Sequence, residues 1–187
     1  MKRIQNVFDE SPIIAAVKDD EQLYQAMATD CAVIFILYGT ICTIAQIVER
    51  IKDVKKIAIV HIDLIVGLSS KDIAVDFIKS HTKADGIIST KQNLVKRAVE
   101  LDMYGGQRTF IVDSMALANT KHQLQTFRPS FLEIMPGTIY SVITELHTSN
   151  TVPLVAGGLL ATKKDILSAL DAGASAVSTT RQELWIV

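Results

Sequence analysis

The stretch "LVAGGLLAT", residues 154–162, contains an apolar run that stops at two adjacent glycines before a threonine. A short apolar run bounded by glycines is typical of a buried strand. Thr162 with Asp165 fits the [ST]-x-x-[DE] pattern that begins a helix. The stretch therefore predicts a junction at which a buried strand passes into a helix through Gly157 and Gly158, two residues without side chains.

The same strand–helix unit is expected eight times along the chain. Most of the runs are nearly continuous in apolar residues, as in parallel strands that are covered on both faces. The segments between them have the i, i+3, i+4 spacing of amphipathic helices, as in Ile44, Ile47 and Ile51. The expected strands are residues 12–17, 31–37, 56–62, 86–89, 108–113, 131–135, 152–156 and 174–178.

Glycines and capping residues mark the junctions between these segments. Four glycines follow an expected helix and precede a strand, where a left-handed residue commonly ends a helix: Gly86, Gly105, Gly106 and Gly173. Five follow an expected strand: Gly39, Gly67, Gly137, Gly157 and Gly158. Two further pairs also fit the capping pattern: Ser69 with Asp72, and Thr180 with Glu183.

Eight such units favour a (β/α)8 barrel over a doubly wound sheet. The first expected strand ends in "AAVKDDEQ", without the G-x-G-x-x-G of a dinucleotide-binding fold, and the glycine pair follows the seventh strand. We therefore predict an α/β protein, a compact (β/α)8 TIM-type barrel with short loops and a truncated last helix in "TTRQELWIV". Without a linker or a composition break, residues 1–187 are expected to be one domain, with residues 1–11 as an N-terminal lead-in.

Composition narrows the possible partners and the location. The chain has 187 residues, a formal net charge of −1 and 49% apolar residues, so nothing general attracts nucleic acid or an anionic membrane. Cys31 and Cys42 are too few for a disulfide framework or a zinc site, and no histidine–carboxylate spacing indicates a metal. The N-terminus lacks the apolar core of a secretory signal, and "CAVIFILYG" is too short to span a membrane. A cytoplasmic location and no metal are predicted.

In a barrel, the functional residues lie on the loops after the strands, and those after strands seven and eight commonly hold phosphate. Backbone N–H groups near glycines can approach a phosphate closely, and hydroxyls add donors. The predicted phosphate site is Gly157, Gly158, Ser178, Thr179 and Thr180. The alternative is that the glycines form only a tight turn and that Thr180 only caps the last helix.

Charged and polar side chains follow other expected strands at the same end: Lys18, His61, Asp63, Lys91, Asp113 and Glu133. Asp63 and Glu133 end apolar strands, where an uncompensated charge costs several kcal/mol. They either form an ion-pair network with Lys18 and Lys91 or bind the hydroxyls of a ligand. His61 is either a base, a supporting donor or a core residue.

The whole chain from about residue 5 resembles the glycerol uptake operon antiterminator regulators of Gram-positive bacteria. The resemblance lies in "HIDLIVGL" (61–68), "DGIISTK" (85–91), "QRTFIVDS" (107–114), "EIMPG" (133–137) and "VAGGLLAT" (155–162). It implies a regulator rather than an enzyme, without a cofactor, whose effector is glycerol 3-phosphate and whose partner is the leader mRNA of glycerol-utilisation genes.

The resemblance also implies a division of the site. The phosphate would lie on Gly157, Gly158, Ser178 and Thr179. The hydroxyls of the glycerol would meet Asp63 and Glu133, with Lys18, Lys91 and Asp113 nearby.

Two other functions stay open on the sequence. One is a phosphotriose or phosphopolyol enzyme of lyase or isomerase type, with Lys18 or Lys91 acting on a carbonyl and Asp63 or Glu133 as base. The other is a phosphate-binding barrel that acts only through protein partners. The surface that meets RNA and the need for a homo-oligomer are equally open.

Overall fold

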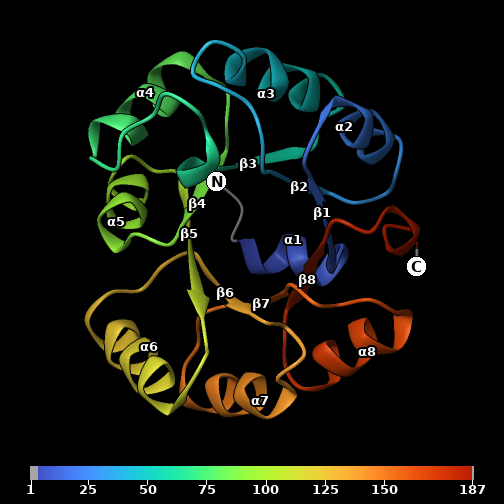
Figure 1. Cartoon of the computed structure of the whole chain (residues 1–187), viewed down its shortest axis with the longest axis vertical. Coiled ribbons are helices and arrows are strands. Elements are labelled where there is room, and N and C mark those ends of the chain that lie inside the picture. Colours follow the sequence, from blue (N-terminus) through green and yellow to red (C-terminus); the bar gives the residue numbers. More distant parts are fainter. Residues whose placement is uncertain (1–3, 187) are drawn as a thin grey trace.

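The computed structural model describes residues 4–186, and its eight parallel strands close into a barrel in the order β1 to β8. Figure 1 shows the strands as an inner ring surrounded by helices. The predicted (β/α)8 barrel is therefore confirmed. The strands are β1 (Ile13–Val17), β2 (Val33–Ile36), β3 (Ile57–His61), β4 (Gly86–Ser89), β5 (Tyr104–Phe110), β6 (Phe131–Met135), β7 (Leu154–Gly157) and β8 (Ala176–Thr179).

Seven helices form the outer ring, and the eighth unit ends in a single 3-10 turn, η2 (Gln182–Leu184). This turn agrees with the prediction of a truncated last helix. No helix within residues 4–186 has the length and apolarity needed to cross a membrane. The outer helices are α2 (Asp20–Met27), α3 (Ile44–Asp53), α4 (Ile73–His81), α5 (Gln92–Glu100), α6 (Ser114–Thr126), α7 (Tyr140–Ser149) and α8 (Lys163–Asp171), with a short turn, η1 (Ile62–Leu64), after β3.

An additional helix, α1 (Ile4–Glu10), lies within the expected lead-in and closes the amino end of the barrel. Its buried residue Phe8 packs edge-on against Phe131, with ring centroids 5.9 Å apart. Phe35 stacks on the same Phe131 ring at 5.7 Å. All three side chains are fully buried, so the lumen is a packed core and not a pore.

Strand β5 begins at Tyr104, four residues before the predicted start at Arg108, so Gly105 and Gly106 are strand residues and not helix ends. A Cβ on Gly106 would lie 2.2 Å from Cζ of Phe131. A glycine is thus required at position 106 because the Phe131 ring occupies the space of a side chain there. The prediction of left-handed helix ends was wrong for Gly86, Gly105 and Gly106, and right for Gly173, which has φ +106.

The capping predictions also divide. Thr162 and Asp165 form the predicted capping box at the start of α8. Ser69 does not cap α4, because that helix begins after Asp72, which makes no side-chain capping bond. Thr180 does not cap η2 either, since the residue before that turn is Arg181. Both of these predictions were wrong because the loops run further than the pattern suggested, by three residues before α4 and by one residue before η2.

We expect Phe131→Ala to lower the free energy of unfolding by about 3–5 kcal/mol, because it opens a cavity between Phe8 and Phe35. For a chain of this length the melting temperature should fall by roughly 6–20 °C. Phe110→Ala is the matched control, since Phe110 is 53% exposed and its loss should cost less than about 0.5 kcal/mol. Equal losses in the two variants, measured by thermal melting, would contradict the packing described for the lumen.

Candidate ligand site at the carboxyl ends of the strands

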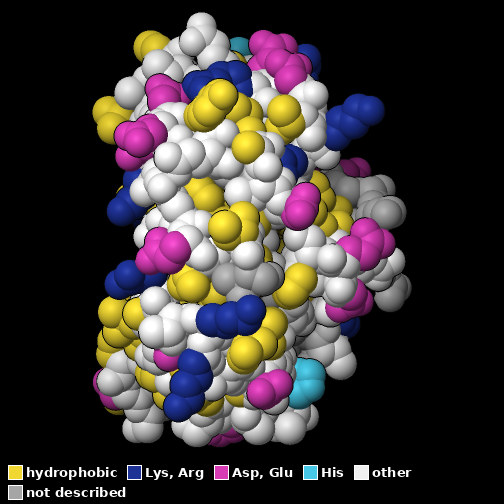
Figure 2. All heavy atoms as spheres, turned by 90° about the vertical axis from the view of Figure 1, so that its right-hand side faces the viewer, with side chains coloured by type: hydrophobic (Ala, Val, Ile, Leu, Met, Phe, Trp, Pro, Cys, Tyr) yellow, Lys and Arg dark blue, Asp and Glu magenta, His cyan; other side chains and the backbone are white. Residues whose placement is uncertain are grey.

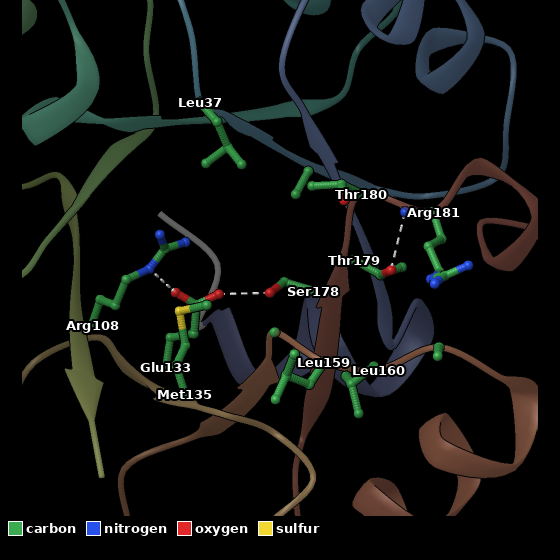
Figure 3. Close-up of a pocket in the computed structure, with 13 residues that line it drawn as sticks. Leu37, Arg108, Glu133, Met135, Leu159, Leu160, Ser178, Thr179, Thr180 and Arg181 are labelled. Carbon is green, nitrogen blue, oxygen red and sulfur yellow. Dashed lines mark hydrogen bonds and ion pairs between the residues drawn. The ribbon is translucent and has the colours of Figure 1, made fainter. Parts of the chain in front are cut away.

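A cavity of about 440 Å³ opens at the carboxyl ends of the strands, between the loops that follow β7 and β8 and the polar residues of β5 and β6. Ligand sites for small molecules have volumes of this order. Figure 3 shows the cavity and its lining. The lining residues are Ala16, Leu37, Arg108, Glu133, Met135, Gly158, Leu159, Leu160, Ala161, Ser178, Thr179, Thr180 and Arg181.

Glu133 is the most buried charged residue on this lining, with no exposed surface. Its Oε1 accepts a hydrogen bond of 2.6 Å from Ser178 Oγ. Its Oε2 accepts a hydrogen bond from Nε of Arg108 on the neighbouring strand (Figure 3). A buried carboxylate requires such partners, because its desolvation costs several kcal/mol. Three strands, β5, β6 and β8, therefore meet in one ion-paired group.

Arg108 was absent from the predicted site. With strand five expected at 108–113, Arg108 fell at the amino end, far from the loops. In the structure β5 spans Tyr104–Phe110, and Arg108 pairs in register with Glu133 near the carboxyl end. The signal that could have found Arg108 is "YGG", residues 104–106. If these residues are taken as the beginning of the strand, Arg108 falls near its carboxyl end, at the site.

Gly157 lies beneath the cavity, at the end of β7, rather than on its lining. A Cβ at this position would lie 2.6 Å from Glu133 Oε1 and 2.8 Å from Ser178 Oγ. The first glycine of the pair thus leaves room for the bond between Glu133 and Ser178.

Gly158 and Leu159 form the turn that follows, with left-handed φ values of +72 and +58. Within residues 4–186, no acceptor is bonded to the backbone N–H groups of Gly158, Leu159 or Thr180. All three residues line the cavity. Backbone N–H groups are strong donors that seek an acceptor. The cavity wall thus presents several open donors.

Two amides further along the loop after β7 are already bonded. Asp165 Oδ2 accepts the N–H groups of Ala161 and Thr162 at 3.0 and 2.8 Å. On the other loop, Thr179 Oγ1 accepts from the N–H of Arg181 at 3.1 Å. The open donors are therefore those of the two loops that precede α8 and η2.

Asp63 and Lys91 belong to a second polar cluster, outside the cavity lining. Asp63 accepts hydrogen bonds from Ser89 Oγ and from the N–H of Thr90 at 2.8 Å, and Lys91 Nζ lies 3.3 Å from its Oδ1. Burial alone would raise the pKa of Asp63, but these hydrogen bonds outweigh it and hold the pKa below its usual value. Lys91 Nζ also donates to Ser70 Oγ at 2.7 Å.

The remaining predicted residues also lie off the lining. Asp113 is the N-cap of α6 and accepts from the N–H of Ala116 at 2.8 Å. Lys18 follows β1 and is exposed. Among residues 4–186, no group of three or more His, Cys, Asp or Glu side chains is placed to hold a metal ion.

His61 ends β3 and is 3% exposed. Its Nδ1 has no hydrogen-bond partner in the described part of the chain, residues 4–186, and lies 3.9 Å from Asp63 Oδ2. Burial and the nearby charge of Arg108 lower the pKa of His61 to about 4. The imidazole is therefore neutral at pH 7.

These observations define a (β/α)8 barrel with a ligand-sized polar cavity at the carboxyl ends of its strands. Comparison with known proteins makes the class specific: the family model described as Glycerol-3-phosphate responsive antiterminator matches residues 13–185. The chain belongs to this family, as the sequence resemblance implied.

The chain is also similar to individual proteins. The chain is 41% identical over 176 residues to Uncharacterized protein YgcP of Escherichia coli (strain K12), covering 94% of this chain and 92% of that protein. It is similar to the glycerol uptake operon antiterminator regulatory protein of Listeria monocytogenes, with 29% identity, TM-score 0.89 and coverage of 92% and 94%. It is also similar to a glycerol uptake operon antiterminator-related protein of Thermotoga maritima, with 27% identity, TM-score 0.83 and coverage of 94% and 98%.

Burial of neutral His61 predicts a pH-dependent stability. Its pKa lies near 4 in the folded state against 6.5 ordinarily, so the unfolded chain takes up the proton first as the pH falls. The free energy of unfolding should therefore fall by about 2 kcal/mol between pH 7 and pH 5 because of His61.

Urea unfolding of His61→Gln should therefore show a smaller loss of stability over this pH range than the wild-type protein. His122→Gln, on the exposed surface of α6, should keep the wild-type pH dependence. Identical pH dependence in all three proteins would show that His61 is not buried in its neutral form.

Proposed function

We propose that this chain is a metabolite-responsive antiterminator that binds glycerol 3-phosphate in the cavity and acts on the leader mRNA of glycerol-utilisation genes. Family membership supports the effector and the regulatory role. The observation that carries the binding site is the set of open backbone N–H groups at Gly158, Leu159 and Thr180. The N–H of a loop is well suited to a phosphate, since it donates without a side chain in the way.

The rest of the lining supports the same ligand. The side chains of Thr179 and Thr180 bring hydroxyls to the same end of the cavity. Arg181, which is paired with Glu183 at 3.3 Å, also lines it. The Ser178 hydroxyl donates to Glu133. Arg108, which is paired with Glu133, lies within reach of the other end of a small ligand and offers donors. We therefore assign the phosphate to the loops after β7 and β8, and the hydroxyls to Arg108 beside Glu133.

This assignment modifies the site that the resemblance implied. Glu133 stays at the hydroxyl end of the ligand, as the partner of Arg108. Asp63, Lys91 and His61 form instead a neighbouring polar group that supports the loop after β3. For the lyase or isomerase alternative, Lys18 or Lys91 would have to reach a bound carbonyl, and neither lines the cavity.

RNA recognition rests on family membership rather than on charge. Figure 2 shows Lys, Arg, Asp and Glu side chains interspersed on the face that carries α2 and α8, without a continuous basic area. The formal net charge of the whole chain is −1, so no overall positive charge attracts RNA. We therefore expect few phosphate contacts and a dependence on bound effector.

Glycerol 3-phosphate at a hundred times its Kd should stabilise the protein by about 2.7 kcal/mol, a rise in melting temperature of roughly 5–10 °C. Gly158→Val should abolish this rise, because φ of +72 is strained for a β-branched residue and the side chain would disturb the turn. The measurement is thermal melting with and without ligand.

Gly67→Val is the matched control. Gly67 also has a left-handed φ, +93, but lies in the loop after β3, away from the cavity lining. It should lower the melting temperature and retain the rise with glycerol 3-phosphate. If Gly158→Val keeps the full rise in melting temperature with ligand, the turn at Gly158 is not part of the binding site. If the wild-type protein converts a phosphotriose to product, the enzyme alternative is favoured.

Glycerol 3-phosphate should tighten binding to the leader RNA of the cognate glycerol genes by about 5–150-fold, the range of ordinary allosteric coupling. The affinity should fall linearly on a log–log plot against salt, with a slope of about −0.7 per phosphate contacted if the RNA is single-stranded. Gel-shift titration at three salt concentrations measures both. An RNA affinity that is the same with and without ligand, or no RNA binding at all, would contradict the proposed regulation.

A further inference from the structure

We propose that the Arg108–Glu133 pair selects ligands by charge: it admits a phosphate compound whose other end carries neutral hydroxyls and excludes one whose other end is a carboxylate. This inference rests on the proposed function, because it assumes that the phosphate is held by the loops after β7 and β8. It adds a specificity-determining residue, Arg108, and assigns Glu133 the task of rejecting acids.

The first step is the position of the guanidinium. Arg108 lies on β5, and Figure 3 shows its guanidinium on the side of the cavity away from Thr179 and Leu160. A ligand phosphate on the loops would therefore leave the remainder of the ligand directed toward β5 and β6. Arg108 and Glu133 both line this part of the cavity.

The second step is the bonding of the pair. Nε of Arg108 donates to Glu133, whereas Nη1 and Nη2 have no hydrogen-bond partner among residues 4–186. The side chain is 11% exposed and lines the cavity, and Nη1 and Nη2 are not enclosed by protein atoms. They are therefore open to a ligand that offers an acceptor. The planar fork of two terminal nitrogens fits two oxygens at once.

The third step is charge. Paired with Glu133, Arg108 contributes no net charge to the buried mouth of the cavity. A hydroxyl can accept from the Nη donors, and because it is uncharged it is not repelled by the negative charge of Glu133, which has no exposed surface. A carboxylate can only accept, and it would lie beside a buried carboxylate where screening is weak. The same guanidinium without Glu133 would bind a carboxylate well.

The test compares three ligands on one protein by isothermal titration: glycerol 3-phosphate, 3-phosphoglycerate and inorganic phosphate. The wild-type protein should prefer glycerol 3-phosphate to 3-phosphoglycerate by at least about 100-fold, since like charges at a contact cost several kcal/mol. Glu133→Gln should reduce this preference at least about tenfold and leave the Kd for inorganic phosphate nearly unchanged. Arg108→Lys should bring the affinity for glycerol 3-phosphate toward that for phosphate alone.

Glu49→Gln is the control, because it removes the same charge from an exposed pair, in which Glu49 on α3 lies 2.9 Å from Lys83 in the loop after α4. It should leave all three affinities unchanged. Equal wild-type affinity for glycerol 3-phosphate and 3-phosphoglycerate overturns the inference even if Glu133→Gln does not fold. An unchanged ratio in folded Glu133→Gln also overturns it. If none of the three ligands binds the wild-type protein, the proposed function fails and this inference fails with it.

Discussion

The buried carboxylate of Glu133 is the constraint on which the mouth of this barrel depends. A fully buried charge is tolerated only when it is paired and its remaining lone pairs are bonded. Arg108 and Ser178 meet that need from β5 and β8. Gly157 must then lack a side chain, because a Cβ would collide with the bond between Glu133 and Ser178. One ion pair thus dictates residues on four consecutive strands.

The same constraint explains why the two glycines of "LVAGGLLAT" are not equivalent. Gly157 gives space to the ion-paired group below the cavity, whereas Gly158 gives the left-handed turn that leaves N–H groups open on its wall. In the proposed function, these neighbouring groups contact opposite ends of one small ligand. Ligand binding would then connect the loops after β7 and β8 to β5 and β6, which is a physical basis for a response to the effector.

Periodicity predicted the eight strand–helix units because continuous apolar runs and helical spacing are strong local signals. The fifth strand was placed four residues late because Gly105 and Gly106 resemble a helix end in sequence. Their pairing with β4, and the packing of Phe131 against Gly106, 25 residues apart in the chain, show that they belong to a strand. Because the start of the fifth strand was misplaced, Arg108 was expected at the amino end of the strand, and it was not predicted as the partner of Glu133.

Contacts between distant residues also explain why the other predicted site residues lie outside the cavity. Asp113 and Asp63 are both polar residues at strand ends, and nothing local tells a helix cap from a ligand contact. The structure separates them by their partners: Asp113 caps α6, Asp63 bonds Ser89 and Thr90, and Glu133 lines the cavity. The positions of the loops after β7 and β8 were predictable because the barrel itself sets them, and their binding of phosphate stays a proposal.

The central claim is that the loop amides after β7 and β8 hold the phosphate of glycerol 3-phosphate. Two-dimensional ¹⁵N–¹H NMR during titration with this ligand tests it most directly. The account predicts that the largest shifts occur at the amides of Gly158, Leu159 and Thr180, with a smaller change at the Arg108 side chain. Saturable binding with its largest shifts around Asp63, Thr90 and Lys91, and none at the loops after β7 and β8, would contradict it.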